Sequence, residues 1–237
     1  MATSTEQINQ LIGGFTDLKA FFETHRASLE ADAAAVLSQL ATISRTFYVD
    51  QALGSDDNIG TIEAPLASIT KAAQLTPRGG QLTVILRGDY ITTAREVLEQ
   101  QYVRLTYQGG GTRANLRFAS VASDDPTTIG DISSMIGASF IQADLIHFHL
   151  PVSDPGTSYK GLFRNRGRTA FRFSNCEFTV AAGADTALIR NEIASDLFFE
   201  NTNGGLSHLA GHFVQGVAAG TDPALVYHVR STNQATL

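Results

Sequence analysis

The sequence contains no tryptophan and a single cysteine, Cys176, in 237 residues. One cysteine excludes a disulfide within the chain and any metal site built from cysteines alone. Charged residues make up only 17% of the chain, and the formal net charge of −6 argues against nucleic-acid binding, which needs a basic surface. No apolar run approaches the roughly 18 consecutive residues of a membrane span, so we expect no membrane insertion. The first residues lack a basic start and a compact apolar block, so we also expect no signal peptide.

Residues 1–45 have the pattern of one long amphipathic helix. Apolar residues recur at alternating spacings of three and four, which is the spacing of a coiled-coil seam. Taking Ile8 as position a makes every a position apolar, whereas the later d positions, His25, Asp32 and Gln39, are polar. The expected core of an assembly consists of Ile8, Leu11, Phe15, Leu18, Phe22, His25, Leu29, Val36 and Ile43.

This apolar stripe has two interpretations. It either packs on the rest of its own chain or forms a parallel bundle with copies of itself. The strict heptad and the polar d positions, which tend to fix register, favour the bundle. Phenylalanine at two a positions suits a core wider than that of a dimer. In a trimer, three copies of His25 would meet at the axis, where they could hold an anion or a water molecule, or titrate together.

The character of the sequence changes after residue 45. Residues 46–50 have the composition of a strand, and residues 54–60 form a polar turn cluster. Pro65 opens a short helix predicted over 66–75, with Ile69 on its apolar face.

The rest of the chain reads as a succession of short strands separated by polar turns. Predicted strands include 82–86, 103–107 and 116–118, and 21 glycines in the whole chain suit many turns. An apolar-x-Phe pattern ends at Phe148, Phe173 and Phe199, at nearly equal spacings. Asparagine follows two residues after the second and third, at Asn175 and Asn201.

A weak repeat of about 25 residues is typical of a solenoid. The richness in Phe, Ile, Val and Thr favours strands over helices, so we predict a β-solenoid of about six coils, roughly 30 Å tall at the spacing of neighbouring strands. We divide the chain into a coiled-coil or attachment helix (1–45), an opening strand with a capping helix (46–80), and a parallel β-helix body (81–237).

Residues 46–91 resemble a known family. The segments on which this resemblance rests are Phe47-Tyr48-Val49-Asp50, Gly54-Ser55-Asp56-Asp57-Asn58, Gly60-Thr61, Ala64-Pro65-Leu66-Ala67-Ser68-Ile69, Ala72-Ala73 and Val84-Ile85-Leu86-Arg87-Gly88-Asp89-Tyr90. They look like the start of the right-handed parallel β-helices of the pectate-lyase-like superfamily, as used in bacteriophage tail fibres and tailspikes. The resemblance implies that the short helix caps the open end of the solenoid and that the protein is trimeric. Beyond residue 91, only the rhythm of the strands supports it.

The resemblance implies a structural virion protein, made in the host cytoplasm and located in the phage tail. We expect it to be a short tail fibre or spike component that attaches to other tail or baseplate proteins through its N-terminal segment. We also expect it to present or brace a host-recognition surface, with a host surface glycan as a further ligand. The alternative is a glycan-degrading tailspike acting on host capsule or lipopolysaccharide. A cellular pectate-lyase-like protein would normally be secreted, and the missing signal disfavours that third reading.

Glycan cleavage needs two carboxylates about 5 to 10 Å apart. The candidates are two pairs, Asp124 with Asp125 and Asp196 with Glu200. A turn explains the first pair well, because proline follows it, and outward positions on a strand explain the second. We therefore expect no catalysis.

The remaining candidates concern binding. His147 and His149 alternate on a predicted strand and so face the same side, but nothing completes a metal site with His208 and His212, and we expect no metal and no cofactor. Loops inserted between the strands of a solenoid commonly carry binding residues, and the polar loops 122–133 and 151–160 have this position, although structural turns explain them better. Candidate binding residues are Tyr107, Asp154 and Tyr159.

Overall fold

The computed structural model describes residues 3–121, 128–135, 138–190, 195–202, 206–226 and 229–237. The chain is mainly β-structure in parallel sheets, with one long helix at its N-terminus. It divides into two compact units, Met1–Thr42 and Ile43–Leu237, which we describe separately.

The first unit is helix α1, Ser4–Ile43, which spans roughly 60 Å at about 1.5 Å per residue. Thr3 and Glu6 form a reciprocal cap at its start: the Glu6 N–H donates to Thr3 Oγ1 at 3.4 Å, and the Thr3 N–H donates to Glu6 Oε2 at 2.6 Å. Every residue from Thr3 to Val36 is exposed in the single chain. The side chains of residues 37–42, Gln39 among them, lie outside the described part.

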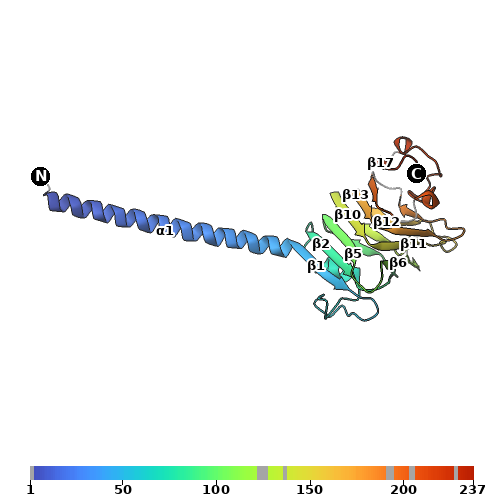
Figure 1. Ribbon diagram of the computed structural model, residues 1–237, viewed down its shortest axis with the longest axis horizontal. Helices are drawn as coiled ribbons and strands as arrows, with labels where there is room; N and C mark the ends of the chain where they lie inside the picture. Colours follow the sequence, from blue (N-terminus) through green and yellow to red (C-terminus); the bar gives the residue numbers. More distant parts are fainter. Residues whose placement is uncertain (1–2, 122–127, 136–137, 191–194, 203–205, 227–228) are drawn as a thin grey trace. The chain divides into compact units, whose positions relative to one another are not determined.

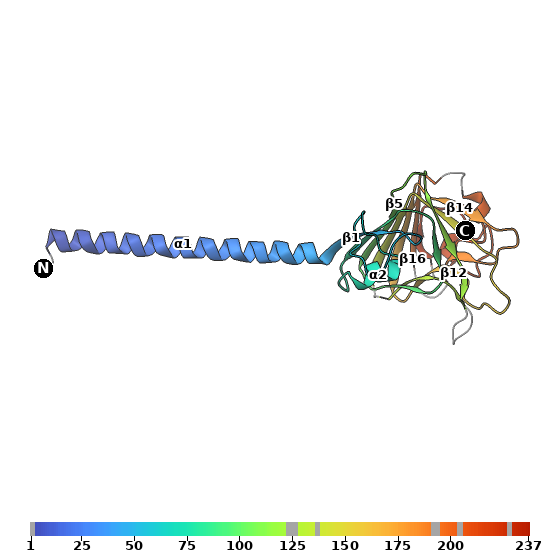
Figure 2. The ribbon, with the colours of Figure 1, turned by 90° about the horizontal axis from the view of Figure 1, so that it is seen from below.

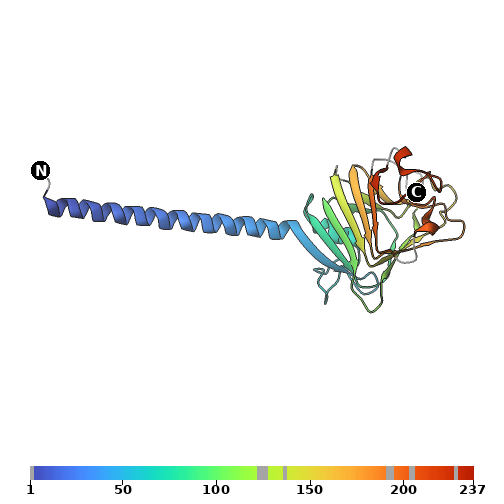
Figure 3. The same ribbon diagram turned by 45° about the horizontal axis from the view of Figure 1, so that its top comes forward.

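The second unit is built from three parallel sheets, which we call A, B and C. Sheet A has the strand order β1-β2-β5-β10-β13-β16-β17, sheet B the order β3-β6-β11-β14 and sheet C the order β4-β9-β12-β15. From β2 to β16 the chain visits A, B and C in turn and then returns to sheet A one strand further along. Figure 3 shows the strands of sheet A side by side in chain order, from blue-green to orange.

The strand bounds are as follows. Sheet A contains β1 Ser44–Val49, β2 Gln81–Leu86, β5 Tyr102–Tyr107, β10 Ala138–Asp144, β13 Arg168–Ser174, β16 Ser195–Glu200 and β17 Val229–Thr232. Sheet B contains β3 Tyr90–Thr92, β6 Ala114–Phe118, β11 Ile146–Leu150 and β14 Glu177–Val180, and sheet C contains β4 Glu96–Leu98, β9 Ile132–Ser134, β12 Gly161–Asn165 and β15 Ala187–Ile189. A small antiparallel pair, β7 Ser120–Val121 and β8 Thr128–Ile129, lies between β6 and β9 in the chain, and two 3₁₀ turns, Ser207–Leu209 and Pro223–Leu225, lie near the C-terminus.

The core lies between the three sheets, because alternate residues of each strand point inward. Parallel register places like positions above one another, as in the buried row Ile141, Phe171 and Leu197. Phe173 lies near the centre of an aromatic cluster, with ring centroids 5.5 Å from Phe148 and 5.2 Å from Phe199.

The repeat predicted from the apolar-x-Phe pattern is half correct. Phe173 and Phe199 pair in adjacent strands of sheet A, but Phe148 lies on sheet B and pairs with Phe178. The true partner of Phe173 in the preceding strand is Ala143. An apolar-x-Phe strand has the same pattern on any of the three sheets, so spacing alone did not separate them.

The corner that follows a strand of sheet A recurs in three successive turns of the chain, after β10, β13 and β16. Leu145, Asn175 and Asn201 occupy it with φ of 59°, 52° and 49°. Asparagine tolerates this left-handed conformation better than other side chains, which explains the recurring asparagine seen in the sequence. Asn175 also donates from Nδ2 to Asp144 Oδ1 at 3.0 Å, which ties one turn to the preceding one.

Helix α2, Ile69–Gln74, buries Ile69 and two alanines against the first strands (Figure 2). It begins three residues later than predicted because Ser68 serves as its N-cap and accepts from the Lys71 N–H at 3.0 Å. A buried carboxylate holds the helix in place: Glu96 accepts from the Tyr90 hydroxyl at 2.6 Å and from the Thr70 N–H at 2.8 Å. Figure 1 shows the strands of the body that follow this helix in the chain.

Candidate binding surfaces

The outer face of sheet A carries a ladder of charged side chains. Outward positions stack in parallel register, so Arg104, Gln142 and Arg172 form one row across three strands. Arg104 Nη2 lies 3.1 Å from Asp144 Oδ2, and Arg172 Nη2 lies 2.6 Å from Glu200 Oε2. Each arginine thus pairs with an acid in the neighbouring row, and the face carries both signs of charge.

Aromatic side chains lie beside this ladder. Tyr102 and Phe140 stack with ring centroids 5.5 Å apart and planes 4° from parallel, and the Tyr102 hydroxyl donates to Gln142 Oε1 at 3.0 Å. A hollow of about 270 Å³ opens next to Phe140. It is lined by Gln101, Ser139, Phe140, Arg168, Ala170 and Asp196. Partly buried aromatic rings beside planar polar groups can hold a flat or amphipathic ligand.

The carboxylates proposed for catalysis do not converge in the described part of the chain. Asp196 is buried and lies 3.5 Å from Arg168, whereas Glu200 is exposed and pairs with Arg172. Four residues along a strand separate them by roughly 13 Å, which exceeds the separation used in glycoside hydrolysis. Asp124 and Asp125 lie outside the described residues, as does much of the loop 122–133.

The three candidate binding residues have structural contacts. The Tyr107 hydroxyl accepts from the Gly111 N–H at 2.9 Å and closes the glycine-rich turn. The Arg190 guanidinium lies 3.2 Å from the centroid of the Tyr159 ring, and the Asp154 carbonyl accepts from the Thr157 N–H at 3.1 Å. These contacts orient the two tyrosines.

Loop 151–160 is fastened to the body by one carboxylate. Asp185 accepts from the Ser153 N–H at 2.8 Å and from the Ser153 hydroxyl at 2.7 Å, and it forms an ion pair with Lys160. Burial opposes ionisation, but these donors outweigh it and lower the pKa of Asp185 to about 2. The loop is therefore held by a carboxylate that stays ionised except in strong acid.

Two histidines lie side by side on the outer face of sheet B, as the alternation in sequence predicted. The rings of His147 and His149 have centroids 4.1 Å apart. Their Nε2 atoms point to different strands: His147 bonds to Thr179 Oγ1 and His149 to Asn115 Oδ1, both at 2.8 Å. Burial is the main cause of the lowered pKa of each ring, and His147 lowers the pKa of His149 further.

The two remaining candidate metal ligands, His208 and His212, bond elsewhere. His208 Nε2 lies 2.8 Å from the Phe178 carbonyl oxygen, and His212 Nδ1 lies 2.7 Å from that of Thr186. Among the described residues, no three histidine, cysteine, aspartate or glutamate side chains are grouped to hold a metal ion. Cys176 is buried, and burial raises the pKa of its thiol to about 12.

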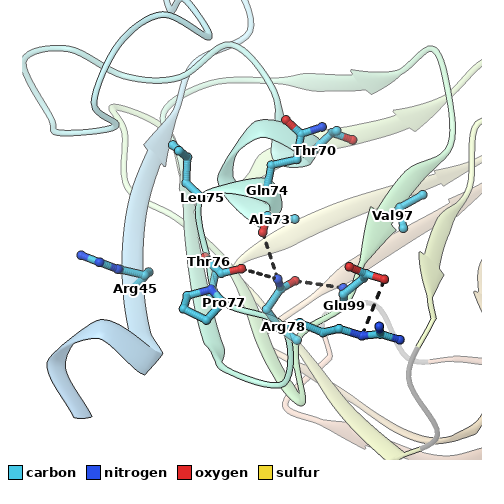
Figure 4. Close-up of a pocket in the computed structure, with 11 residues that line it drawn as sticks. Arg45, Thr70, Ala73, Gln74, Leu75, Thr76, Pro77, Arg78, Val97 and Glu99 are labelled. Carbon is cyan, nitrogen blue, oxygen red and sulfur yellow. Dashed lines mark hydrogen bonds and ion pairs between the residues drawn. The ribbon is translucent and has the colours of Figure 1, made fainter. Parts of the chain in front are cut away.

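A groove of about 520 Å³ runs between β1, α2 and β4 (Figure 4). Gln100 forms part of its wall and donates to the carbonyls of Ala73 and Thr76 at 2.9 and 3.1 Å. Arg78 Nε lies 3.8 Å from Glu99 Oε1 at the rim. The other lining residues are Arg45, Thr70, Gln74, Leu75, Pro77 and Val97. Sequence reasoning missed this groove because its residues come from three separate segments.

Searches against family models, curated proteins and solved structures found no match for this chain. No helix in the described part of the chain is long and apolar enough to cross a membrane.

Proposed function

We propose that this chain is a structural virion protein, a trimeric short tail fibre or spike component. In this proposal, α1 forms a parallel three-stranded coiled coil and serves as the stalk or attachment segment. The body is a right-handed parallel β-helix that presents or braces a host-recognition surface.

The observation that carries the proposal is the apolar seam of α1. Its large apolar a and d side chains from Ile8 to Val36 are between 50 and 69% exposed in the single chain. A hollow of about 500 Å³ lies along the same seam between Phe22, His25 and Leu29. A helix of this kind, with Gly13 and Gly14 inside it, is marginal alone in water, so it needs a partner that covers the stripe.

The strand order supports the β-helix. From β2 to β16, apart from the small β7–β8 pair, consecutive strands follow the cycle of sheets A, B and C, and the ladders of these sheets are parallel. Such a body already buries its own aromatic core, so its folding does not require the helix. This leaves the seam of α1 available for copies of the chain, and it leaves the long face of sheet A as the surface to be presented.

The test is the mass of the full chain in solution and its place on the particle. We expect sedimentation equilibrium to give three times the 25.4 kDa of one chain. We also expect antibodies raised against the chain to label the tails of phage particles in electron micrographs of the source lysate. A monomer at micromolar concentration would overturn the trimer, and unlabelled particles would overturn the virion assignment.

A further inference from the structure

The segment 51–64, which we call the aliphatic loop, exposes large apolar side chains on the first turn of the body. Leu53 is 83% exposed, Ile59 is 72% exposed and Ile62 is 41% exposed. The same segment carries three carboxylates, at Asp56, Asp57 and Glu63, and contains no lysine or arginine. Apolar groups gathered on one surface element and flanked by charges of one sign are typical of a protein-interaction site.

The backbone under these side chains is held by many hydrogen bonds. Asp50 Oδ1 accepts from the Ala52 and Leu53 N–H groups, both at 3.0 Å, and Asp56 accepts from the Ser68 hydroxyl at 2.7 Å. Gly60, with φ of 80°, donates to the Ala64 carbonyl at 3.0 Å. Because the loop is already ordered, binding through it loses little conformational entropy.

The groove between β1, α2 and β4 has the complementary character (Figure 4). Its apolar walls include Leu75 and Val97, both of which are exposed. Arg45 and Arg78 line it against a single acid, Glu99, so the lining carries a net positive charge. An aliphatic, acidic loop and an apolar, basic groove therefore occur on one chain.

We propose that the aliphatic loop of one copy of this chain fills the groove of the next copy. Two different patches that complement each other make a head-to-tail contact, and such a contact closes into a ring when the rotation between copies allows it. This inference rests on the proposed trimer and names the contact that its bodies make. Charge complementarity is what selects a second copy as the occupant.

Cross-linking in the full chain tests the contact. We would substitute Leu53→Cys and Val97→Cys together and treat the protein with a bismaleimide. Cys176 is buried with a raised pKa, so it does not compete. The expected product is a covalent trimer on a denaturing gel. The matched control combines Val97→Cys with Leu225→Cys, a leucine about as exposed as Leu53 but near the C-terminus, and should give no covalent trimer.

A charge exchange gives an independent readout. Arg45→Glu with Arg78→Glu should reduce the cross-linking yield several-fold, and adding Asp57→Lys with Glu63→Lys should restore it. Two results would overturn the loop-in-groove contact and leave the proposed stalk intact. One is a chain of trimeric mass that forms no covalent trimer, and the other is a cross-linking yield that does not change with these charge substitutions. A monomeric wild-type chain would overturn the proposed function, and this inference with it.

Discussion

Replacing Phe22 by alanine is the most direct test of the seam of α1. Phe22 lies at heptad position a, and 62% of its surface is exposed in the single chain. Full burial of such a side chain contributes about 1.5–3 kcal/mol, so covering the exposed part gives about 1–2 kcal/mol per copy and about 3–6 kcal/mol per trimer. Each loss of about 1.4 kcal/mol weakens an equilibrium constant tenfold. The midpoint concentration of a trimer follows the square root of that constant, so we expect the midpoint to rise roughly 10- to 100-fold.

The assay is sedimentation equilibrium over a dilution series, with helix content followed by circular dichroism. Alanine is the strongest helix former, so a loss of trimer cannot come from weaker helix propensity. The matched control is Phe21→Ala, because Phe21 is also about half exposed but lies at position g, beside the seam. Equal shifts for the two variants, or no shift for either, would refute the assigned register.

Three further predictions concern the body, each measured by unfolding. Phe173→Ala should lower the free energy of unfolding by about 3–5 kcal/mol in a denaturant titration, because the side chain is buried among other aromatic rings. The folded state lowers the pKa of His147 and His149, so the unfolded state binds more protons in acid. The melting temperature should therefore fall as the pH drops below about 6.5. His149→Gln should make this fall smaller, and a variant with the same pH profile as wild type would contradict the prediction. Asp185 has a pKa of about 2, so its contribution to folding stability is present above about pH 4 and is lost as the pH falls toward 2. Asp185→Asn should therefore lower the melting temperature at pH 7, whereas near pH 2 the variant and the wild type should melt at similar temperatures.

The strands of the body could be predicted from the sequence because alternation is a local signal. Residues 82–86 and 103–107 were predicted as strands and lie within β2 and β5. The recurring asparagines at 175 and 201 indicated a repeated turn, and both adopt the left-handed conformation there. What failed was long-range: Phe148 was matched to Phe173 by spacing, whereas it pairs with Phe178.

The candidate sites were harder to predict because they depend on which strands pair and on the register of that pairing. Tyr102 and Phe140 stack although they are far apart in the sequence, and only the pairing of β5 with β10 brings them together. Residues 54–60 of the aliphatic loop were predicted as a polar turn cluster, since glycine, serine and aspartate dominate that stretch. Its leucine and isoleucines are exposed, whereas Asp50 and Asp56 accept hydrogen bonds from backbone N–H groups.

In the proposed trimer, the distribution of polar residues along the seam makes a second contact between copies useful. The early heptads have apolar residues at both a and d, but from His25 onward the d positions are polar. A coiled coil with alternate polar layers is weaker, although its register is better fixed. The seam is thus weakest in the heptads that immediately precede β1 in the sequence. In the proposed trimer, the contact between loop and groove adds to the free energy of association that the seam supplies. Shortening the apolar part of the seam should therefore make the trimer depend more strongly on Leu53.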